Sequence, residues 1–171
     1  YEDQNVANLL WAAATAGHSA PLLFDRLAEH AASRVVDFAP QGISNVAWAY
    51  ATAAHSAPAL FEAIAMAAAP RAANFTTQGL ANVAWSFATN EHPAPALLDA
   101  IAEQLTARAN ESAPQGLAIT SWTYATTAHA APRLFDAIAA SARPRLRRFN
   151  AQGISNMAWA YATTGHVVDG F

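Results

Sequence analysis

The sequence predicts an all-α protein, a right-handed α-solenoid in which antiparallel helix pairs follow one another in tandem. The first observation is a fixed period: the tryptophans lie 37 residues apart, at Trp11, Trp48, Trp85, Trp122 and Trp159. The second is that each period carries two segments with helical spacing of apolar residues, and the third is that no segment alternates as a strand would. A fixed period of this length is typical of repeat proteins, whose units stack to bury a shared core.

The period divides the chain into a single array over residues 1–171, with about four and a half repeats. We place the units at about 4–40, 41–77, 78–114 and 115–151, with a partial unit at 152–171. The sequence does not begin with methionine, and neither end shows the polar capping unit that keeps a solenoid soluble. We therefore expect the array to be an excerpt of a longer protein.

The first helix of each unit is expected over residues such as 41–55. Its apolar residues fall on one broad face, in the second unit Ile43, Val46, Ala47, Tyr50 and Ala54. A second stripe follows steps of four, three and four and consists of Gln41, Asn45, Trp48 and Thr52. Gly17 and Gly165 predict a left-handed cap at the end of this helix, and His55 then lies at the negative end of the helix dipole.

The second helix of each unit is expected to begin at a proline such as Pro58, because proline suits the first helical position. Its apolar face is formed in the second unit by Leu60, Phe61, Ile64, Ala65 and Ala68. Pro70 and Pro144 predict a break late in this helix, whereas Ser33 and Ala107 stand at the same place in the other units. A phenylalanine closes each unit at positions 38, 75 and 149, but Ser112 replaces it once.

Composition restricts the possible functions. No apolar run reaches the roughly 18 residues of a membrane span, so we expect none. The chain has no cysteine, which excludes disulfides and thiolate metal sites. Its net charge is −3, with Asp and Glu outnumbering arginine and no lysine present. That balance argues against phosphate neutralisation over the whole surface.

No catalytic or metal site is expected, and we predict a protein without enzyme activity, cofactor or small-molecule substrate. Histidines recur at positions 18, 55, 92, 129 and 166. Packed helices lie about 8–10 Å apart, too far for consecutive histidines to share a zinc ion with ligand distances near 2 Å. We interpret His55 and its equivalents as helix caps. The carboxylates recur singly, and no serine is paired with histidine throughout the repeat.

The stretch P-Q-G-I-S-N-V-A-W-A-Y-A, followed by P-A-L-F-E-A-I-A, resembles the octotricopeptide repeat family and the related heptatricopeptide repeats of some protists. The resemblance covers every unit. It implies a plastid or mitochondrial protein of an alga or related protist that binds single-stranded organellar RNA and assists its stability, processing, translation or ribosome assembly. The pattern is interrupted at Ile119, where asparagine stands elsewhere, and this position and Ser112 mark either a local rearrangement or a different contact.

The repeated polar stripe is interpreted as architecture, because a residue that is the same in nearly every unit cannot discriminate between bases. We expect these amides and indoles to hold neighbouring units together. They comprise Gln41, Asn45, Asn82, Asn156 and the five tryptophans. Base readout is expected at positions that vary and remain exposed, with Asn90, Thr127 and Thr164 as the candidates and the row Ala12, Ala49, Ser86, Thr123 and Ala160 beside them.

Arginine recurs at positions 34, 71, 108 and 145, and an acid recurs at Asp25, Glu62, Asp99 and Asp136. Both rows are expected on the outer helices, where they form either exposed ion pairs or, for arginine, a phosphate track. The best local candidate for a phosphate or acidic-partner contact is the cluster Arg143, Arg145, Arg147 and Arg148, with Arg133 nearby.

The sequence is compatible with two functions. The family resemblance favours an RNA-binding module. The acidic balance and small variable residues favour a scaffold or linker that binds a protein or peptide in a large organellar assembly, such as a ribosome or photosynthetic supercomplex.

Overall fold

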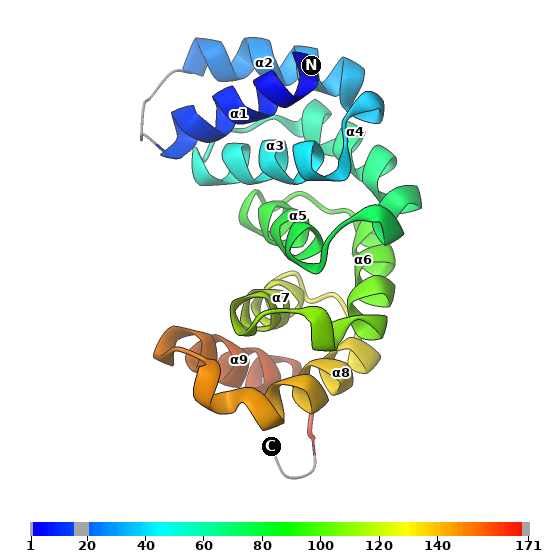
Figure 1. The fold of residues 1–171 in the computed structure, drawn as a ribbon, viewed down its shortest axis with the longest axis vertical. Helices are drawn as coiled ribbons and strands as arrows, with labels where there is room; N and C mark the ends of the chain where they lie inside the picture. The colour runs from blue at the N-terminus through cyan, green and yellow to red at the C-terminus, as the bar shows by residue number, and fades with distance from the viewer. Residues whose placement is uncertain (1, 16–20, 169–171) are drawn as a thin grey trace.

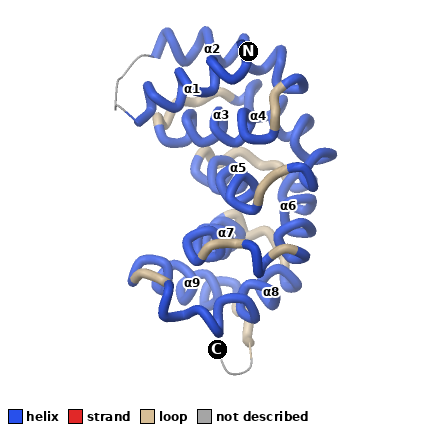
Figure 2. Tube along the Cα trace, in the orientation of Figure 1, coloured by secondary structure: helices blue, strands red, loops and turns tan. Residues whose placement is uncertain are grey.

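The computed structural model describes residues 2–15 and 21–168, and all of the regular structure in these ranges is helical (Figure 2). The all-α prediction is therefore confirmed. Gly17 and His18 lie outside the described residues, as does the side chain of Trp11. The α-helices are α1 (Glu2–Thr15), α2 (Pro21–Arg34), α3 (Pro40–Thr52), α4 (Pro58–Ala68), α5 (Thr77–Thr89), α6 (Pro95–Ala107), α7 (Pro114–Thr126), α8 (Pro132–Ala142) and α9 (Ala151–Thr164). The 3-10 helices in the described ranges are η1 (Val35–Asp37), η2 (Ala69–Asn74), η3 (Ala109–Glu111) and η4 (Arg143–Arg148).

The helices pack in two rows. Each odd-numbered helix from α1 to α9 contacts the next odd-numbered one, each even-numbered helix from α2 to α8 contacts the next even-numbered one, and the two rows also contact each other. Figure 1 shows the array as an arc, with α3, α5 and α7 on its inner side and α4, α6 and α8 on its outer side. The core therefore runs along the arc between the two rows.

From α3 onward, the first helix of each unit ends in a Schellman motif. In α3 the N–H of Ala54 donates to the carbonyl of Ala51 at 3.2 Å, and the N–H of His55 donates to the carbonyl of Tyr50 at 3.1 Å. Gly165 takes the left-handed position after α9 with φ of 64°, which confirms the predicted cap there. The same conformation is adopted by residues that are not glycine, at Ala54, Glu91 and Ala128. Ala54 thus lies beyond the helix and is exposed, whereas the sequence placed it on the buried face.

Replacing Ala128 with glycine is expected to raise the free energy of unfolding by about 0.5–1 kcal/mol, because its φ of 50° strains an L-residue but suits glycine. The control is Ala140→Gly, the same chemical change at an exposed position inside α8, which should instead lower stability by roughly 0.5–1 kcal/mol. Urea denaturation measures both. Equal destabilisation by the two variants would contradict the strain at Ala128.

In the units that carry a late proline, the second helix ends just before that proline, as predicted. The α4 and α8 helices stop at Ala68 and Ala142, and 3-10 turns containing Pro70 and Pro144 follow. Without that proline, α2 and α6 continue to Arg34 and Ala107. The closing phenylalanines are buried at positions 38, 75 and 149, and Ser112 is buried in the same place.

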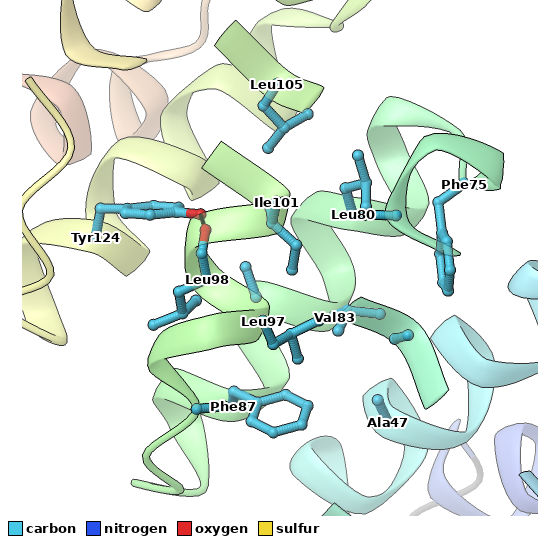
Figure 3. Packing of buried hydrophobic residues seen from close by; sticks show 14 of the residues in the cluster. Ala47, Phe75, Leu80, Val83, Phe87, Leu97, Leu98, Ile101, Leu105 and Tyr124 are labelled. Atoms are coloured by element: carbon cyan, nitrogen blue, oxygen red, sulfur yellow. Dashed lines mark hydrogen bonds between the residues drawn. The ribbon is translucent and has the colours of Figure 1, made fainter. Parts of the chain in front are cut away.

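A recurring cluster of aromatic residues joins each helix pair to the next. The Tyr50 hydroxyl on α3 donates to the Phe24 carbonyl on α2 at 2.7 Å, and the two rings meet edge to face at 5.2 Å. Tyr124 and Tyr161 make the same bond to the preceding unit, and Figure 3 shows the Tyr124 hydroxyl directed toward Leu98 within the packed aliphatic residues of α6. Burial raises the pKa of all three tyrosines well above its usual value, and the nearby carboxylates of Asp25, Asp99 and Asp136 raise it further.

Candidate nucleic-acid interface

The repeated arginines hold neighbouring units together by binding backbone carbonyls. Arg71 donates from Nε to the Ala67 carbonyl at 3.0 Å and from Nη1 to the Val36 and Phe38 carbonyls at 3.1 and 3.2 Å. Arg108 reaches the Phe75 carbonyl at 2.9 Å. Arg71 and Arg108 thus bind the end of the preceding unit. Arg108 also forms an exposed ion pair of the kind that the sequence suggested, with its Nε 3.0 Å from Glu111 Oε2.

Arg145 belongs to this structural row, although the sequence grouped it with the candidate contacts. Its Nη1 donates to the carbonyls of Ser112 and Asn110 at 3.0 and 3.4 Å, and Nη2 donates to the Ser141 hydroxyl. The Ser141 hydroxyl in turn donates to the Ala109 carbonyl at 3.0 Å. Ser112 is therefore tied into a local hydrogen-bond network.

The other arginines of the cluster are exposed. Arg147 and Arg148 on η4 make no ion pair or side-chain hydrogen bond with the described residues, and the same is true of Arg133. Arg143 is exposed but has a partner within the protein. Arg133 lies in the first turn of α8, whereas Arg147 and Arg148 follow the end of that helix. The structure therefore separates Arg133 from the cluster.

The side chains expected to read bases are hydrogen-bonded to backbone carbonyls of their own helices. Asn90 Nδ2 donates to the Ser86 carbonyl at 3.0 Å, and the hydroxyls of Thr127 and Thr164 each donate to the carbonyl four residues earlier at 2.9 Å. The neighbouring row is exposed at Ala12 but fully buried in the later units, at Ala49, Ser86, Thr123 and Ala160. The expectation that this whole row stays exposed is wrong, because from α3 onward the position lies on the side of its helix that packs on the preceding odd-numbered helix. Thr123 Oγ1 is buried without a hydrogen-bond partner.

The histidines pair with acids across the unit boundary, a role beyond the helix cap that the sequence suggested. His55 Nε2 lies 2.8 Å from Asp25 Oδ1, and the same pairing, 30 residues apart, joins His129 to Asp99 and His166 to Asp136. His92 lies 3.6 Å from Glu62. The N–H of each of these four histidines donates the longer bond of the Schellman motif, and each ring lies against the aromatic residue five positions earlier.

The tryptophan row is half-buried at Trp48, Trp85 and Trp122, while Trp159 on α9 is 46% exposed. Trp48 packs against the hydrophobic core. This placement suits a mainly architectural indole.

Beside this row, the amides line three cavities between consecutive odd-numbered helices. The first, about 480 Å³, lies between α3 and α5 and is lined by Gln41, Asn45, Gln78 and Asn82. The second, about 310 Å³, lies between α5 and α7 and shares Gln78 and Asn82 with the first. The third, about 220 Å³, lies between α7 and α9 and shares Gln115 with the second. We call this continuous series of cavities the amide groove.

We expected the amides of the groove to join neighbouring units, but most of them do not form hydrogen bonds between units in the part of the chain that the structure describes. Among the described residues, the side chains of Gln41, Asn45, Gln78, Asn82 and Gln115 make no hydrogen bond. Gln152 instead bonds to Asn156 at 2.8 Å on α9. An amide offers both donors and an acceptor, so the five unpartnered amides are available to a ligand.

Helix N-termini add further donors to the groove. The α3 and α7 helices begin with Pro40 and Pro114, and neither has a side-chain cap, so their first N–H groups remain available and carry a partial positive charge. The N-termini of α5 and α9 are capped by Thr76 and Asn150. Arg148 and Asn150 line the third cavity, so the groove is neutral along its first two cavities and cationic in the third.

Ile119 lines the second cavity, where the repeat pattern would place a third asparagine. The sequence identified this departure but not its surroundings. The groove itself was not predicted, because spacing alone places the amides on one helix face but does not show whether a neighbouring unit binds them.

Across the described residues, none of the helices combines the length and apolar character needed to cross a lipid bilayer. Nor do histidines and acids gather there into a group of three that would hold a metal ion. In comparison with known proteins, no family model and no curated protein matches the chain.

Proposed function

We propose that the chain is a right-handed solenoid of about four and a half 37-residue repeats that binds single-stranded RNA along the amide groove, in an organelle and without catalysis. The observation that carries this proposal is the continuous row of unpartnered amides leading to Arg148. Amide side chains hydrogen-bond the exposed edges of unpaired bases. The organellar location and the role in RNA metabolism rest on the family resemblance alone.

Phosphate contacts fit the same groove. The uncapped N-termini of α3 and α7 offer backbone N–H groups with partial positive charge, and Arg148 with the adjacent exposed Arg147 supplies full charges at one end. Few cations are involved, so affinity depends less steeply on salt than in proteins that bind through a long basic surface. Asn90, Thr127 and Thr164 lie near the opposite ends of their helices, roughly 18 Å away along a helix of 13 residues, and are not part of this contact.

The neutral stretch of the groove also supports a second function, binding of an extended peptide by a scaffold protein. The residues that line the first two cavities carry no charged side chain. Amides there would bond the N–H and C=O groups of a peptide backbone, which also need both donors and acceptors.

The RNA proposal is tested by titrating the chain against a labelled random-sequence 12-nucleotide RNA at several salt concentrations. We expect the Arg147→Ala/Arg148→Ala double variant to weaken binding at least tenfold at low salt. Loss of two phosphate contacts should also reduce the slope of log affinity against log salt by about 1.4. Gln78→Ala should weaken binding with little change in slope, because it removes a neutral contact.

The control is Arg26→Ala/Arg133→Ala, which removes the same charge from exposed sites outside the groove. Equal weakening by both double variants would show that net charge alone governs binding. Absence of RNA binding at low salt would refute the proposal and leave the peptide-binding function.

A further inference from the structure

The α9 helix has two unlike sides. One side is buried against the preceding unit and contains Gly153, Met157, Ala160 and Tyr161. The other side is uncovered within the described residues, with Ile154 at 47% and Trp159 at 46% exposure. Two large apolar side chains close together on one helix face are typical of a surface that binds another protein element.

The uncovered side of α9 has the same residues as a covered side elsewhere in the chain. In α3, Ile43, Ser44, Ala47 and Ala51 are 0–4% exposed and Trp48 is half-buried. Both α5 and α4 pack on α3, and Ser44 lies against Gly79 of α5. At the five equivalent positions α9 carries identical residues, in the order Ile154, Ser155, Ala158, Trp159 and Ala162. We call these five residues the α9 face.

The α3–α5 contact shows which features a partner of the α9 face needs. A Cβ atom at Gly79 on α5 would lie 2.9 Å from Ser44 Oγ, closer than atoms pack, so glycine permits the approach. The Ser44 hydroxyl also lies 3.4 Å from the Gly79 carbonyl. Since Ser155 repeats Ser44, the matching partner carries glycine in its first turn, followed by the apolar face of α5.

The α1 helix of a second copy does not meet this requirement. Where α3, α5, α7 and α9 carry glycine at the equivalent position, α1 carries Asn5. Its larger side chain would prevent the close approach seen at Gly79. Head-to-tail association of identical chains is therefore disfavoured at the α9 face.

We propose that the α9 face is a docking site for an amphipathic helix of the α5 type, supplied by another helical-repeat unit with glycine at the position of Gly79. The contact continues the interface already formed between α3 and α5. It is separate from the amide groove and does not depend on RNA binding.

The test uses the full chain and a labelled peptide of residues 76–92, stapled between positions 81 and 85, on the side of α5 that faces α7 in the protein, so that the docking side stays free. Helicity of the peptide is first verified by circular dichroism, because an isolated helix of this length is marginal in water. Fluorescence anisotropy should then show saturable binding. The Ile154→Glu chain should bind at least tenfold more weakly, and so should the wild-type chain with a peptide carrying Gly79→Leu.

The matched control is Met66→Glu, which places the same charge at another apolar residue that is 72% exposed. It should leave peptide affinity unchanged. Equal binding by the Ile154→Glu and wild-type chains, or no saturable binding of the verified helix, would overturn the proposal. Concentration-dependent dimerisation of the chain that Ile154→Glu abolishes would also overturn it, because a second copy would then be the occupant.

Discussion

Replacing Phe61 with alanine is expected to lower the free energy of unfolding by about 3–5 kcal/mol, the usual cost of removing a buried phenylalanine. Phe61 is 1% exposed, and its ring lies 4.9 Å from that of Phe87 and 5.8 Å from that of His92. Phe61 belongs to α4 but both of these rings follow in the next unit. The cavity left by the missing ring would therefore weaken the contact between α4 and the next unit, which makes neighbouring helix pairs unfold together.

Urea denaturation followed by circular dichroism measures this loss. The control is Met66→Ala on the same helix, where the side chain is 72% exposed and the expected change is within about 0.5 kcal/mol. A loss below about 1 kcal/mol for Phe61→Ala would contradict the structure. A broader transition at reduced stability would show that units on the two sides of α4 no longer unfold as one.

The sequence predicts those parts of the fold that depend on local chemistry. Pro70 and Pro144 cannot continue a helix, so the ends of α4 and α8 follow from the residues themselves. The buried positions of α3 follow from helical spacing, and Ile43, Val46, Ala47 and Tyr50 are each fully buried. Such features require no knowledge of what a helix packs against.

The burial of small residues does not follow from the residues themselves. Alanine, serine and threonine at positions 49, 86, 123 and 160 suit an exposed or a buried site equally, and only packing against the preceding odd-numbered helix shows that all four are buried. The non-glycine residues that have positive φ in the described part of the chain are equally unpredictable from the sequence. Ala54 and Ala128 give no signal of a left-handed conformation, which is fixed by the Schellman bonds around them.

Contacts between units were the least predictable feature of the candidate site. The acid row and the histidine row each showed the period, but the bond between Asp25 and His55 requires that the end of one helix meet the start of another. Arg71, Arg108 and Arg145 bind carbonyls, which every residue possesses and which therefore leave no mark in the sequence. The amide groove could not be predicted either, because the spacing of Gln78 and Asn82 does not show that their side chains lack hydrogen-bond partners.

Replacing Arg71 with methionine is expected to lower the free energy of unfolding by about 2–3 kcal/mol. Methionine retains much of the apolar side chain but removes donors from the carbonyls of Val35, Val36 and Phe38 in the preceding unit. Hydrogen bonds from a charged group contribute more than neutral ones, and partly buried carbonyls left without a donor add a desolvation cost. Urea denaturation is again the measurement, with Arg147→Met as the exposed, unbonded control and an expected change within about 0.5 kcal/mol.

Arg71→Lys separates the shape of the guanidinium from its charge. A phosphate track would accept lysine with little loss of RNA affinity, because a compact cation also binds phosphate. The carbonyl clamp needs several donors held in a planar fork, from Nε to Ala67 and from the two terminal nitrogens to η1 and Phe38. We therefore expect Arg71→Lys to lose at least half of the stability lost by Arg71→Met while RNA binding by the folded protein stays unchanged. Full stability of Arg71→Lys with weakened RNA binding would contradict the clamp and return Arg71 to the nucleic-acid interface.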